Sequence, residues 1–275
     1  MKKKIVSLLF LCLVMLAVIA CTDKEEPEST PEPAKEMLTV MSYNIHIANP
    51  PSKGEGFVDI EAIANAINKE KPDLVALQEV DKFTTRSGTS LDQAKEIATL
   101  TGMKYFFAKA INRSDGEYGV AILSKFSIEN SKVFSLPVKT TGAELRALGL
   151  IETSLPNGKK IVFASTHLDH LSDENRELQV REVIKALIPY QDRPVILGGD
   201  FNMAPQNAIW NVVREQFVLG CKTCPSTFPA TSPNTTIDYL LLNKQAAAYF
   251  TIKDYYAVPE RYASDHVPIV MKIEY

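Results

Sequence analysis

The stretch PVILGGDFN, residues 194–202, passes from an apolar run directly into the polar pair Asp200 and Asn202. Three other stretches are also apolar first and polar last: LTVMSYNIH at 38–46, DLVALQEVD at 73–81 and KIVFASTHLDH at 160–170. Two more are reversed, IDYLLLN at 237–243 and SDHVPIVMKI at 264–273. If the last two form strands antiparallel to the others, all the polar ends meet at one rim of the sheets.

Side chains in a strand alternate between its two faces, so residues two apart share a face. This alternation predicts that three pairs point the same way: Asn44 with His46, His167 with Asp169, and Asp200 with Asn202. The four histidines of the chain all lie in these stretches: His46, His167, His170 and His266. Such a concentration of polar residues at strand ends indicates one functional rim.

The remaining pattern predicts many strands and few helices. About ten apolar runs are rich in Val, Ile, Leu and aromatic residues, whereas helical periodicity is confined to windows near 60–67, 91–98, 178–187 and 208–213. Strands that follow strands between 118 and 168 favour antiparallel neighbours. Strands that are apolar on both faces favour a core between two layers. We expect one α/β (α+β) domain over residues 37–275, with two mixed sheets packed together and helices outside.

Composition excludes several classes of protein. Of the 275 residues, 45% are hydrophobic and 23% are charged, which is ordinary for a globular chain and excludes a disordered or collagen-like one. The net charge is −3, and it becomes −6 for a chain that begins at Cys21, because Lys2, Lys3 and Lys4 are then lost. An acidic chain is not suited to non-specific binding of nucleic acid, although a local basic groove remains compatible with it.

The N-terminal 20 residues have the pattern of a signal peptide. A basic start, Met1–Lys4, precedes an uncharged run over Ile5–Ala20, which is short for a membrane span. The segment LAVIAC, which ends at Cys21, resembles a bacterial lipobox, so we expect lipidation of Cys21 and a cell-envelope lipoprotein held to the outer membrane, in the periplasm or at the surface. An uncleaved helix and plain secretion are the alternatives. Residues 21–36, acidic and proline-containing, predict a disordered tether.

The two cysteines of the folded part form one C-x-x-C motif, Cys221 and Cys224. Without a second pair or a nearby histidine, this motif is not typical of a zinc site. A local disulfide and two free thiols are both compatible with an oxidising compartment.

The predicted rim carries the chemistry of metal-assisted phosphoester hydrolysis. It gathers four carboxylates, Glu79, Asp200, Asp238 and Asp265, and crowded carboxylates repel one another unless a cation or a proton intervenes. Oxygen ligands without cysteine favour Mg²⁺, Mn²⁺ or Ca²⁺ over zinc. Histidines beside them are suited to hold a phosphoryl oxygen or to act as acid and base near neutral pH.

Seven motifs in order, YNIH, LQEVD, YGVAILS, STHLDH, GGDFN, IDYLLLN and SDHVP, resemble the endonuclease/exonuclease/phosphatase superfamily over residues 38–275. The resemblance implies a four-layer αββα sandwich of the deoxyribonuclease-I-like type. It also implies a metal site of Glu79, Asp265 and Asn44, with Asn44 orienting a metal-bound water or the phosphate, and Mg²⁺ or Mn²⁺ as the ion, with Ca²⁺ also compatible.

The same resemblance assigns catalytic roles. His266 matches the catalytic histidine, and Asp238 the aspartate that orients it. Asp200 and Asn202 match the pair that positions the nucleophilic water and the scissile phosphate, and His167 matches a phosphate-binding histidine. Whether Asp200 or His266 takes the proton of the water stays open.

Four further residues are candidates for substrate or phosphate binding: Tyr118, Arg146, His46 and Asp169. Their alternatives are packing for Tyr118, a surface ion pair for Arg146, and support of the following helix for Asp169.

We expect a phosphodiesterase for a lipid head group or another small molecule, working as a monomer with a phosphoester substrate and with the membrane as its partner. The alternative is an extracellular nuclease on DNA or RNA. A non-catalytic binding module is disfavoured, because every catalytic position is filled.

Overall fold

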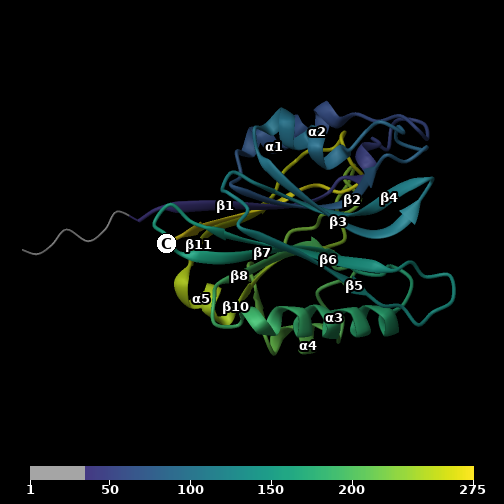
Figure 1. Ribbon diagram of the computed structural model, residues 1–275. Helices are drawn as coiled ribbons and strands as arrows, with labels where there is room; N and C mark the ends of the chain where they lie inside the picture. Colours follow the sequence, from purple (N-terminus) through teal and green to yellow (C-terminus); the bar gives the residue numbers. More distant parts are fainter. Residues whose placement is uncertain (1–34) are drawn as a thin grey trace, which may run out of the picture. The chain divides into compact units, whose positions relative to one another are not determined.

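Two six-stranded mixed sheets pack face to face in the computed structural model, which describes residues 35–275 (Figure 1). The first sheet has the order β11-β12-β1-β2-β4-β3. Its strands, in chain order, are β1 (Met37–Asn44), β2 (Leu74–Lys82), β3 (Lys104–Arg113), β4 (Gly116–Ser124), β11 (Thr251–Ala257) and β12 (Ile269–Glu274).

The second sheet has the order β5-β6-β7-β8-β10-β9. Its strands are β5 (Asn130–Leu136), β6 (Arg146–Ser154), β7 (Lys160–His167), β8 (Val195–Asp200), β9 (Phe217–Leu219) and β10 (Asp238–Asn243). β10 is antiparallel to β8 and β12 is antiparallel to β1, whereas β1–β2 and β7–β8 are parallel pairs. The predicted strand directions are therefore confirmed, and the polar ends do meet at one rim.

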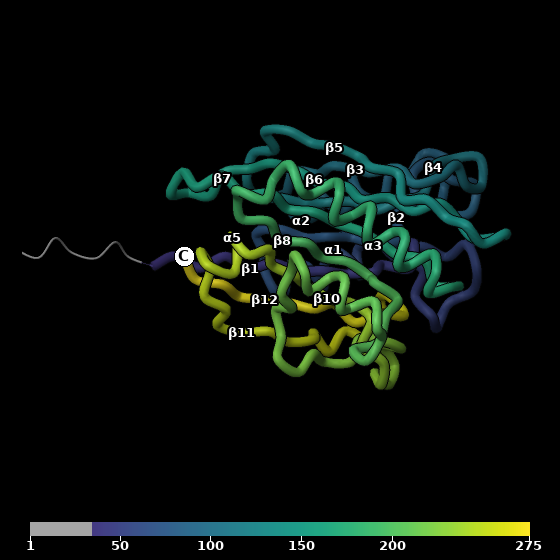
Figure 2. Tube along the Cα trace, turned by 90° about the horizontal axis from the view of Figure 1, so that it is seen from below, coloured from purple at the N-terminus to yellow at the C-terminus, as the bar shows by residue number. Residues whose placement is uncertain are grey.

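Helices cover the outer face of each sheet, which completes the expected four layers (Figure 1). The first sheet carries α1 (Ile60–Glu70) and α2 (Gln93–Thr101), and the second carries α3 (Asp173–Leu187) and α4 (Trp210–Arg214). Side-chain oxygens of Asp59, Asp92 and Ser172 accept hydrogen bonds from the first turns of α1, α2 and α3, as N-cap residues commonly do. In Figure 2, α3 lies across the second sheet.

The sheets approach each other closely near the catalytic rim. Gly198 of β8 faces Ala76 and Ser42 of the first sheet, and a Cβ atom added to it would lie 2.8 Å from the Cβ of Ala76. A larger residue at Gly198 would therefore push the sheets apart. Further from the rim, the space between the sheets is filled by apolar side chains such as Phe163, Ile196 and Leu242.

Short elements account for the differences from the expected secondary structure. The three-residue strand β9 and the helix α5 (Lys244–Tyr249) were not predicted, because both are too short to establish a period. Two 3-10 helices, His46–Ala48 and Ile188–Tyr190, are also too short to be predicted from a periodic pattern. Cys221 and Cys224 form a disulfide, one of the two states that the sequence left open.

The two ends of the described chain are paired. The backbone N–H of Glu36 donates to the carbonyl of Tyr275 at 3.0 Å, and the N–H of Tyr275 donates back to Glu36 at 3.0 Å. At the opposite ends of the same two strands, Asn44 is the last residue of β1 and His266 lies three residues before the start of β12. The start of the described chain and the C-terminus therefore lie at the pole of the sandwich away from the catalytic rim (Figures 1 and 2).

None of the helices within residues 35–275 is both long and apolar enough to cross a membrane. The predicted signal peptide, the lipidation site Cys21 and nearly all of the predicted tether lie in residues 1–34, outside the described residues.

Candidate active site

A cavity of about 500 Å³ opens at the rim where the polar strand ends meet. Its lining includes nine of the residues that the sequence singled out: His46, Glu79, Tyr118, Arg146, His167, Asp200, Asn202, Asp265 and His266. Both sheets contribute to it. Asn44 and Asp238 do not line the cavity, and each hydrogen-bonds a residue that does.

Asp200, at the end of β8, is the centre of the site. Its Oδ2 atom accepts a hydrogen bond from the Nδ2 of Asn44 at 3.0 Å, and it lies 3.6 Å from the Nε2 of His167 and 3.8 Å from the Nε2 of His266. Its other oxygen accepts from the backbone N–H of Asn202 at 2.9 Å. Burial, followed by the charge of Asp238, raises the pKa of Asp200 to about 7.

Asn44 links the two sheets. Its Nδ2 gives one hydrogen to Asp200 of the second sheet and the other to the Oε1 of Glu79 in the first sheet, also at 3.0 Å. Its Oδ1 accepts from the backbone N–H of His46 at 3.1 Å, which fixes the orientation of the amide. Asn44 therefore positions two carboxylates relative to each other.

Glu79 reaches the cavity through a break in β2. The register of β2 against β4 shifts between Leu77 and Val80, and Glu79 has a φ of +55°. A bulge of this kind re-aims a side chain, and a left-handed backbone at a non-glycine residue is costly, so both features are frequent at functional sites. Within residues 35–275 no lysine, arginine or histidine forms an ion pair with Glu79, which leaves its charge for another cation.

His266 is held as a charged donor by Asp238. The Nδ1 of His266 lies 2.9 Å from the Oδ2 of Asp238, which can only accept, so Nδ1 carries a proton. Burial alone would lower the pKa of His266, but the charge and hydrogen bond of Asp238, with the charges of Asp200 and Asp265, outweigh burial and raise it to about 10. The ring also packs on Phe228, with centroids 4.9 Å apart.

His167 has the opposite protonation state. Burial, then the charges of Arg146 and His266, hold the pKa of His167 well below its ordinary value. The Nδ2 of Asn202 donates to the carbonyl of Leu168 at 3.0 Å and lies 3.2 Å from the Nε2 of His167, so this imidazole nitrogen accepts. The site therefore places a neutral imidazole and an imidazolium on either side of one carboxylate.

The donor set fits a hard divalent cation. Asp200, Asp238 and His266 each offer one ligand atom, all within 4.8 Å of one another, and this buried group could hold a metal ion. Since Asp238 and His266 already hydrogen-bond each other, the cavity-facing carboxylates Glu79 and Asp265 are better placed to add oxygen ligands next to Asp200.

Arginines line one wall of the cavity. Arg146 is only 4% exposed, lies 3.7 Å from Glu144, and its Nε has no hydrogen-bond partner among the described residues. Arg86 makes two hydrogen bonds to Asp81, at 2.7 and 2.8 Å, and lies 5.2 Å from the ring centroid of Tyr118. The buried position of Arg146 argues against the alternative of a surface ion pair.

Sequence reasoning missed three charged or aromatic lining residues, Arg86, Arg113 and Phe228, and the aliphatic residues Ile47 and Ile237. Arg86 lies in the stretch DKFTTRSG, five residues after Asp81, and this spacing was an available signal. Arg113 is the last residue of β3 and Phe228 lies in a loop, and no periodicity distinguishes either of them.

Strand alternation explains less of the site than expected. β1 ends at Asn44 and β8 at Asp200, so His46 and Asn202 are brought into the cavity by residues with φ near +50° rather than by alternation. Asp169 is not part of the cavity lining. Its carboxylate accepts from the backbone N–H groups of Leu171 and Ser172 and from Asn175, which supports the start of α3.

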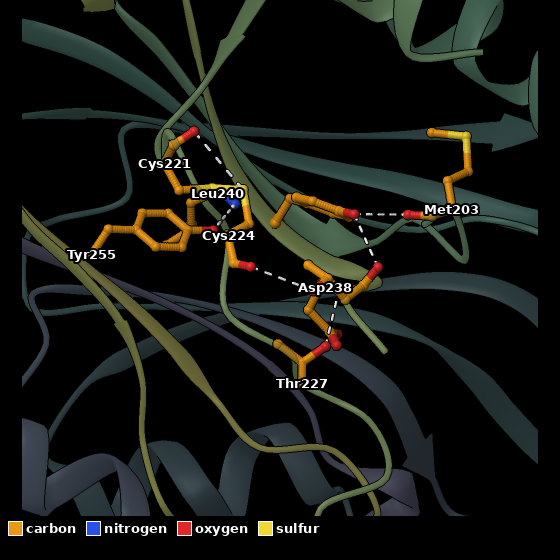
Figure 3. The surroundings of a disulfide bond; sticks show 9 residues. Met203, Cys221, Cys224, Thr227, Asp238, Leu240 and Tyr255 are labelled. Carbon is orange, nitrogen blue, oxygen red and sulfur yellow. Dashed lines mark hydrogen bonds between the residues drawn. A yellow bond between two sulfur atoms is a disulfide. The ribbon is translucent and has the colours of Figure 1, made fainter. Parts of the chain in front are cut away.

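The disulfide lies at the start of the loop that carries Phe228. Figure 3 shows Cys221 and Cys224 near Thr227 and Asp238. The hydroxyl of Thr227 lies 3.4 Å from the backbone nitrogen of Asp238, and the carbonyl of Thr227 accepts from Val267 at 2.9 Å. This loop therefore braces the segments on both sides of the Asp238–His266 pair.

Comparisons with known proteins agree with this geometry. The model of the endonuclease/exonuclease/phosphatase family matches residues 41–266. No curated protein matches the chain. Among solved structures, an endonuclease/exonuclease/phosphatase from Beutenbergia cavernae has a TM-score of 0.72 and 23% identity, covering 86% of this chain and 71% of that one.

Two further structures show the same fold. A mannosyl-6-phosphatase from Bacteroides thetaiotaomicron has a TM-score of 0.70 and 22% identity, over 86% of this chain and 99% of that one. The catalytic domain of human Nocturnin with bound sulfate has a TM-score of 0.67 and 19% identity, over 87% and 97%. The family match agrees with the αββα layers and with the carboxylates and histidines at the strand ends. The chain belongs to the endonuclease/exonuclease/phosphatase family of hydrolases.

Proposed function

We propose that the protein is a divalent-metal-dependent phosphoesterase that acts on a small molecule or head group outside the cytoplasm. The observation that carries this proposal is the arrangement around the Oδ2 of Asp200, with one imidazole 3.6 Å away, another 3.8 Å away, and Glu79 and Asp265 in the same cavity. Acidic oxygens, paired histidines and a wall of arginines together suit a phosphoester better than an uncharged substrate.

Glu79 and Asp265, next to Asp200, would hold the metal ion, with Mg²⁺ or Mn²⁺ favoured by an all-oxygen set. When bound, such an ion neutralises the carboxylates and polarises a phosphoryl oxygen. The residues of the chain bind the phosphate and stabilise the transition state. Arg146, whose Nε is without a partner among the described residues, would contact the phosphate oxygens, Asn202 holds His167 and Asp200 in place, and His266 donates a hydrogen bond from Nε2 to the charge that develops in the transition state.

Asp200 is the acceptor for the proton of the attacking water. His266 is already protonated on Nδ1 through Asp238, so its Nε2–H serves as a donor. The carboxylate of Asp200 lies between the two imidazoles and faces the cavity, where a water can contact it. A carboxylate whose pKa is raised toward neutral pH by burial is a suitable general base.

For localisation, the basic start, the short apolar core and the small residue before Cys21 support lipidation at Cys21 and retention at the cell envelope. Substrates that the protein encounters at the cell envelope are extracytoplasmic. With a lipid on Cys21, the membrane is the partner that holds the protein.

A substrate screen with the purified full-length protein in detergent tests the activity. It compares bis(4-nitrophenyl) phosphate, 4-nitrophenyl phosphate, hexose phosphates, phosphatidylinositol, sphingomyelin, RNA and plasmid DNA, with Mg²⁺ and with excess chelator. We expect Mg²⁺-dependent hydrolysis of small esters, and Asp200→Asn is the matched inactive control. Cleavage of nucleic acid alone would instead support the alternative of an extracellular nuclease, and full activity with chelator would contradict the metal requirement.

A further inference from the structure

One carboxylate lies among the arginines of the active-site wall. Glu144, in the loop before β6, lines the main cavity together with Arg86, Arg113 and Arg146. One of its oxygens forms an ion pair with Arg113, and the other lies 3.7 Å from the Nη1 of Arg146. The side chain of Glu144 is 29% exposed, so water screens its charge only in part. Glu144 has no part in the mechanism proposed above.

Arg146 does not depend on Glu144 for its place in the wall. It is the first residue of β6, where its backbone pairs with Leu136 of β5. Its side chain is buried, and its Nη2 lies 3.3 Å from the Nδ1 of His170. The contribution of Glu144 is therefore a negative charge beside a buried guanidinium, rather than the position of that guanidinium.

The charges of this wall nearly cancel. Asp81 accepts two hydrogen bonds from Arg86, and Glu144 is shared by Arg113 and Arg146. Three guanidinium groups thus face two carboxylates, which leaves one net positive charge. Because Asp81 is fully buried and Glu144 lines the cavity, Glu144 is the carboxylate of the wall that a bound phosphoryl group meets directly.

The charge of Glu144 acts inside the cavity. Burial, followed by the charge of Glu79, raises the pKa of the Tyr118 hydroxyl, and the charge of Glu144 acts in the same direction. Tyr118 lines the cavity and is only 7% exposed. Since charges interact more strongly where water is partly excluded, a phosphoryl group that contacts Arg146 would also experience the charge of Glu144.

Phosphoesters differ in the charge that they bring to such a wall. A phosphodiester carries one negative charge near neutral pH, whereas a phosphomonoester carries about 1.5 to 2. One net positive charge on the wall balances the diester. The additional charge of a monoester has no such balance and is repelled by the nearby carboxylate.

We propose that Glu144 determines the charge specificity of the active site, by lowering its affinity for a doubly charged phosphoryl group relative to a singly charged one. The proposal rests on the phosphoesterase function proposed above and adds the residue that sets the preference between monoesters and diesters. Arg146 contacts phosphoryl groups of both kinds, and the carboxylate of Glu144 repels the second charge.

Two substrates with the same leaving group isolate the effect of charge. With the purified full-length protein in detergent and Mg²⁺, hydrolysis of bis(4-nitrophenyl) phosphate, a monoanion, is compared with that of 4-nitrophenyl phosphate, a dianion at about pH 8. The variant is Glu144→Gln, and its matched control is Glu117→Gln. Glu117 also contacts two cations, Lys82 at 3.8 Å and Lys109 at 2.9 Å, and its side chain is 33% exposed, but it is not among the residues that line the cavity.

The measured quantity is the kcat/KM of the diester divided by that of the monoester. We expect this ratio to fall about fivefold in Glu144→Gln, mainly through a lower KM for the monoester, because one repulsion at a partly exposed site is removed. Glu117→Gln should leave the ratio unchanged. A ratio that stays the same or rises in Glu144→Gln, or that falls equally in both variants, would overturn the role of Glu144 and leave the phosphoesterase proposal standing.

Binding distinguishes the two proposals if neither ester is hydrolysed. Calorimetric titration with dimethyl phosphate, a monoanion, and methyl phosphate, a dianion, measures the same preference without a chemical step. A relative gain of about fivefold for methyl phosphate in Glu144→Gln, and not in Glu117→Gln, would support the role of Glu144 while the phosphoesterase function fails. Absent binding, or the same preference in the wild type and both variants, would overturn the role of Glu144 as well.

Discussion

Replacing Asp238 with asparagine removes the charge that keeps His266 protonated and leaves the shape of the site nearly unchanged. The pKa of His266 is about 10, against an ordinary value near 6.5. At about 1.4 kcal/mol per pH unit, this difference corresponds to about 5 kcal/mol in favour of the imidazolium. Burial, with His266 only 5% exposed, acts in the opposite direction, so the pKa of His266 in Asp238→Asn should fall far below its value in the wild type.

Two measurements follow from this change. The Cε1–H resonance of His266 in the metal-free protein should titrate near pH 10 in the wild type and at a much lower pH in Asp238→Asn. Hydrolysis should fall by about 10²–10⁴, the usual cost of losing one acid–base group. His266→Ala should lose a similar factor, and the double variant should lose less than the product of the two, because residues that act as a unit are not additive.

Stability gives an independent check with a defined sign. A raised histidine pKa contributes stability that is fully present below the unfolded pKa, near 6.5, and is lost as pH rises through about 10. Between pH 6 and pH 9 the unfolding free energy of the wild type should therefore fall by about 3 kcal/mol through this group, and Asp238→Asn should lack this fall. An unchanged His266 titration in Asp238→Asn, or strictly multiplicative rate losses, would refute the pairing.

Three further predictions test other parts of the molecule. Chelation should abolish hydrolysis and Mg²⁺ or Mn²⁺ should restore it, while Glu79→Gln weakens metal affinity in a titration and leaves the melting temperature intact, because a nearly isosteric change relieves carboxylate repulsion. Trp210→Ala should lower the unfolding free energy by about 3–5 kcal/mol in urea, since the fully buried indole leaves a cavity between α4 and the second sheet. Cys21→Ser should move the protein from the membrane fraction to the soluble fraction of cells, and retention with membranes would contradict lipidation.

The layers of the fold could be predicted because the order of apolar and polar residues within a stretch indicates the direction of its strand. PVILGGDFN and IDYLLLN have opposite orders, and β8 and β10 indeed run antiparallel. Antiparallel neighbours, helical windows and strand-end carboxylates are all local patterns. They identify which residues reach the rim, and Glu79, Asp200 and His266 lie there together.

The rest of the site depends on backbone conformations that no local sequence pattern predicts. The bulge that turns Glu79 inward, and the positive φ values of His46 and Asn202, are imposed by tertiary contacts. Arg86 enters the wall through its ion pair with Asp81, and Phe228 through a loop braced by contacts with distant strands. Asp169 shows the reverse case, a polar residue in a motif whose carboxylate supports a helix start.

The pairing of Glu36 with Tyr275 has a consequence for how the enzyme is attached and handled. Because Glu36 and Tyr275 lie at the pole away from the rim, a bead, a tag or a fluorophore joined after Tyr275 leaves the mouth of the cavity free. The same orientation matters if Cys21 carries the lipid anchor that we propose. A domain held by this pole would present its opening to diffusing solutes, and it would have to turn over to reach lipids of the membrane that holds it.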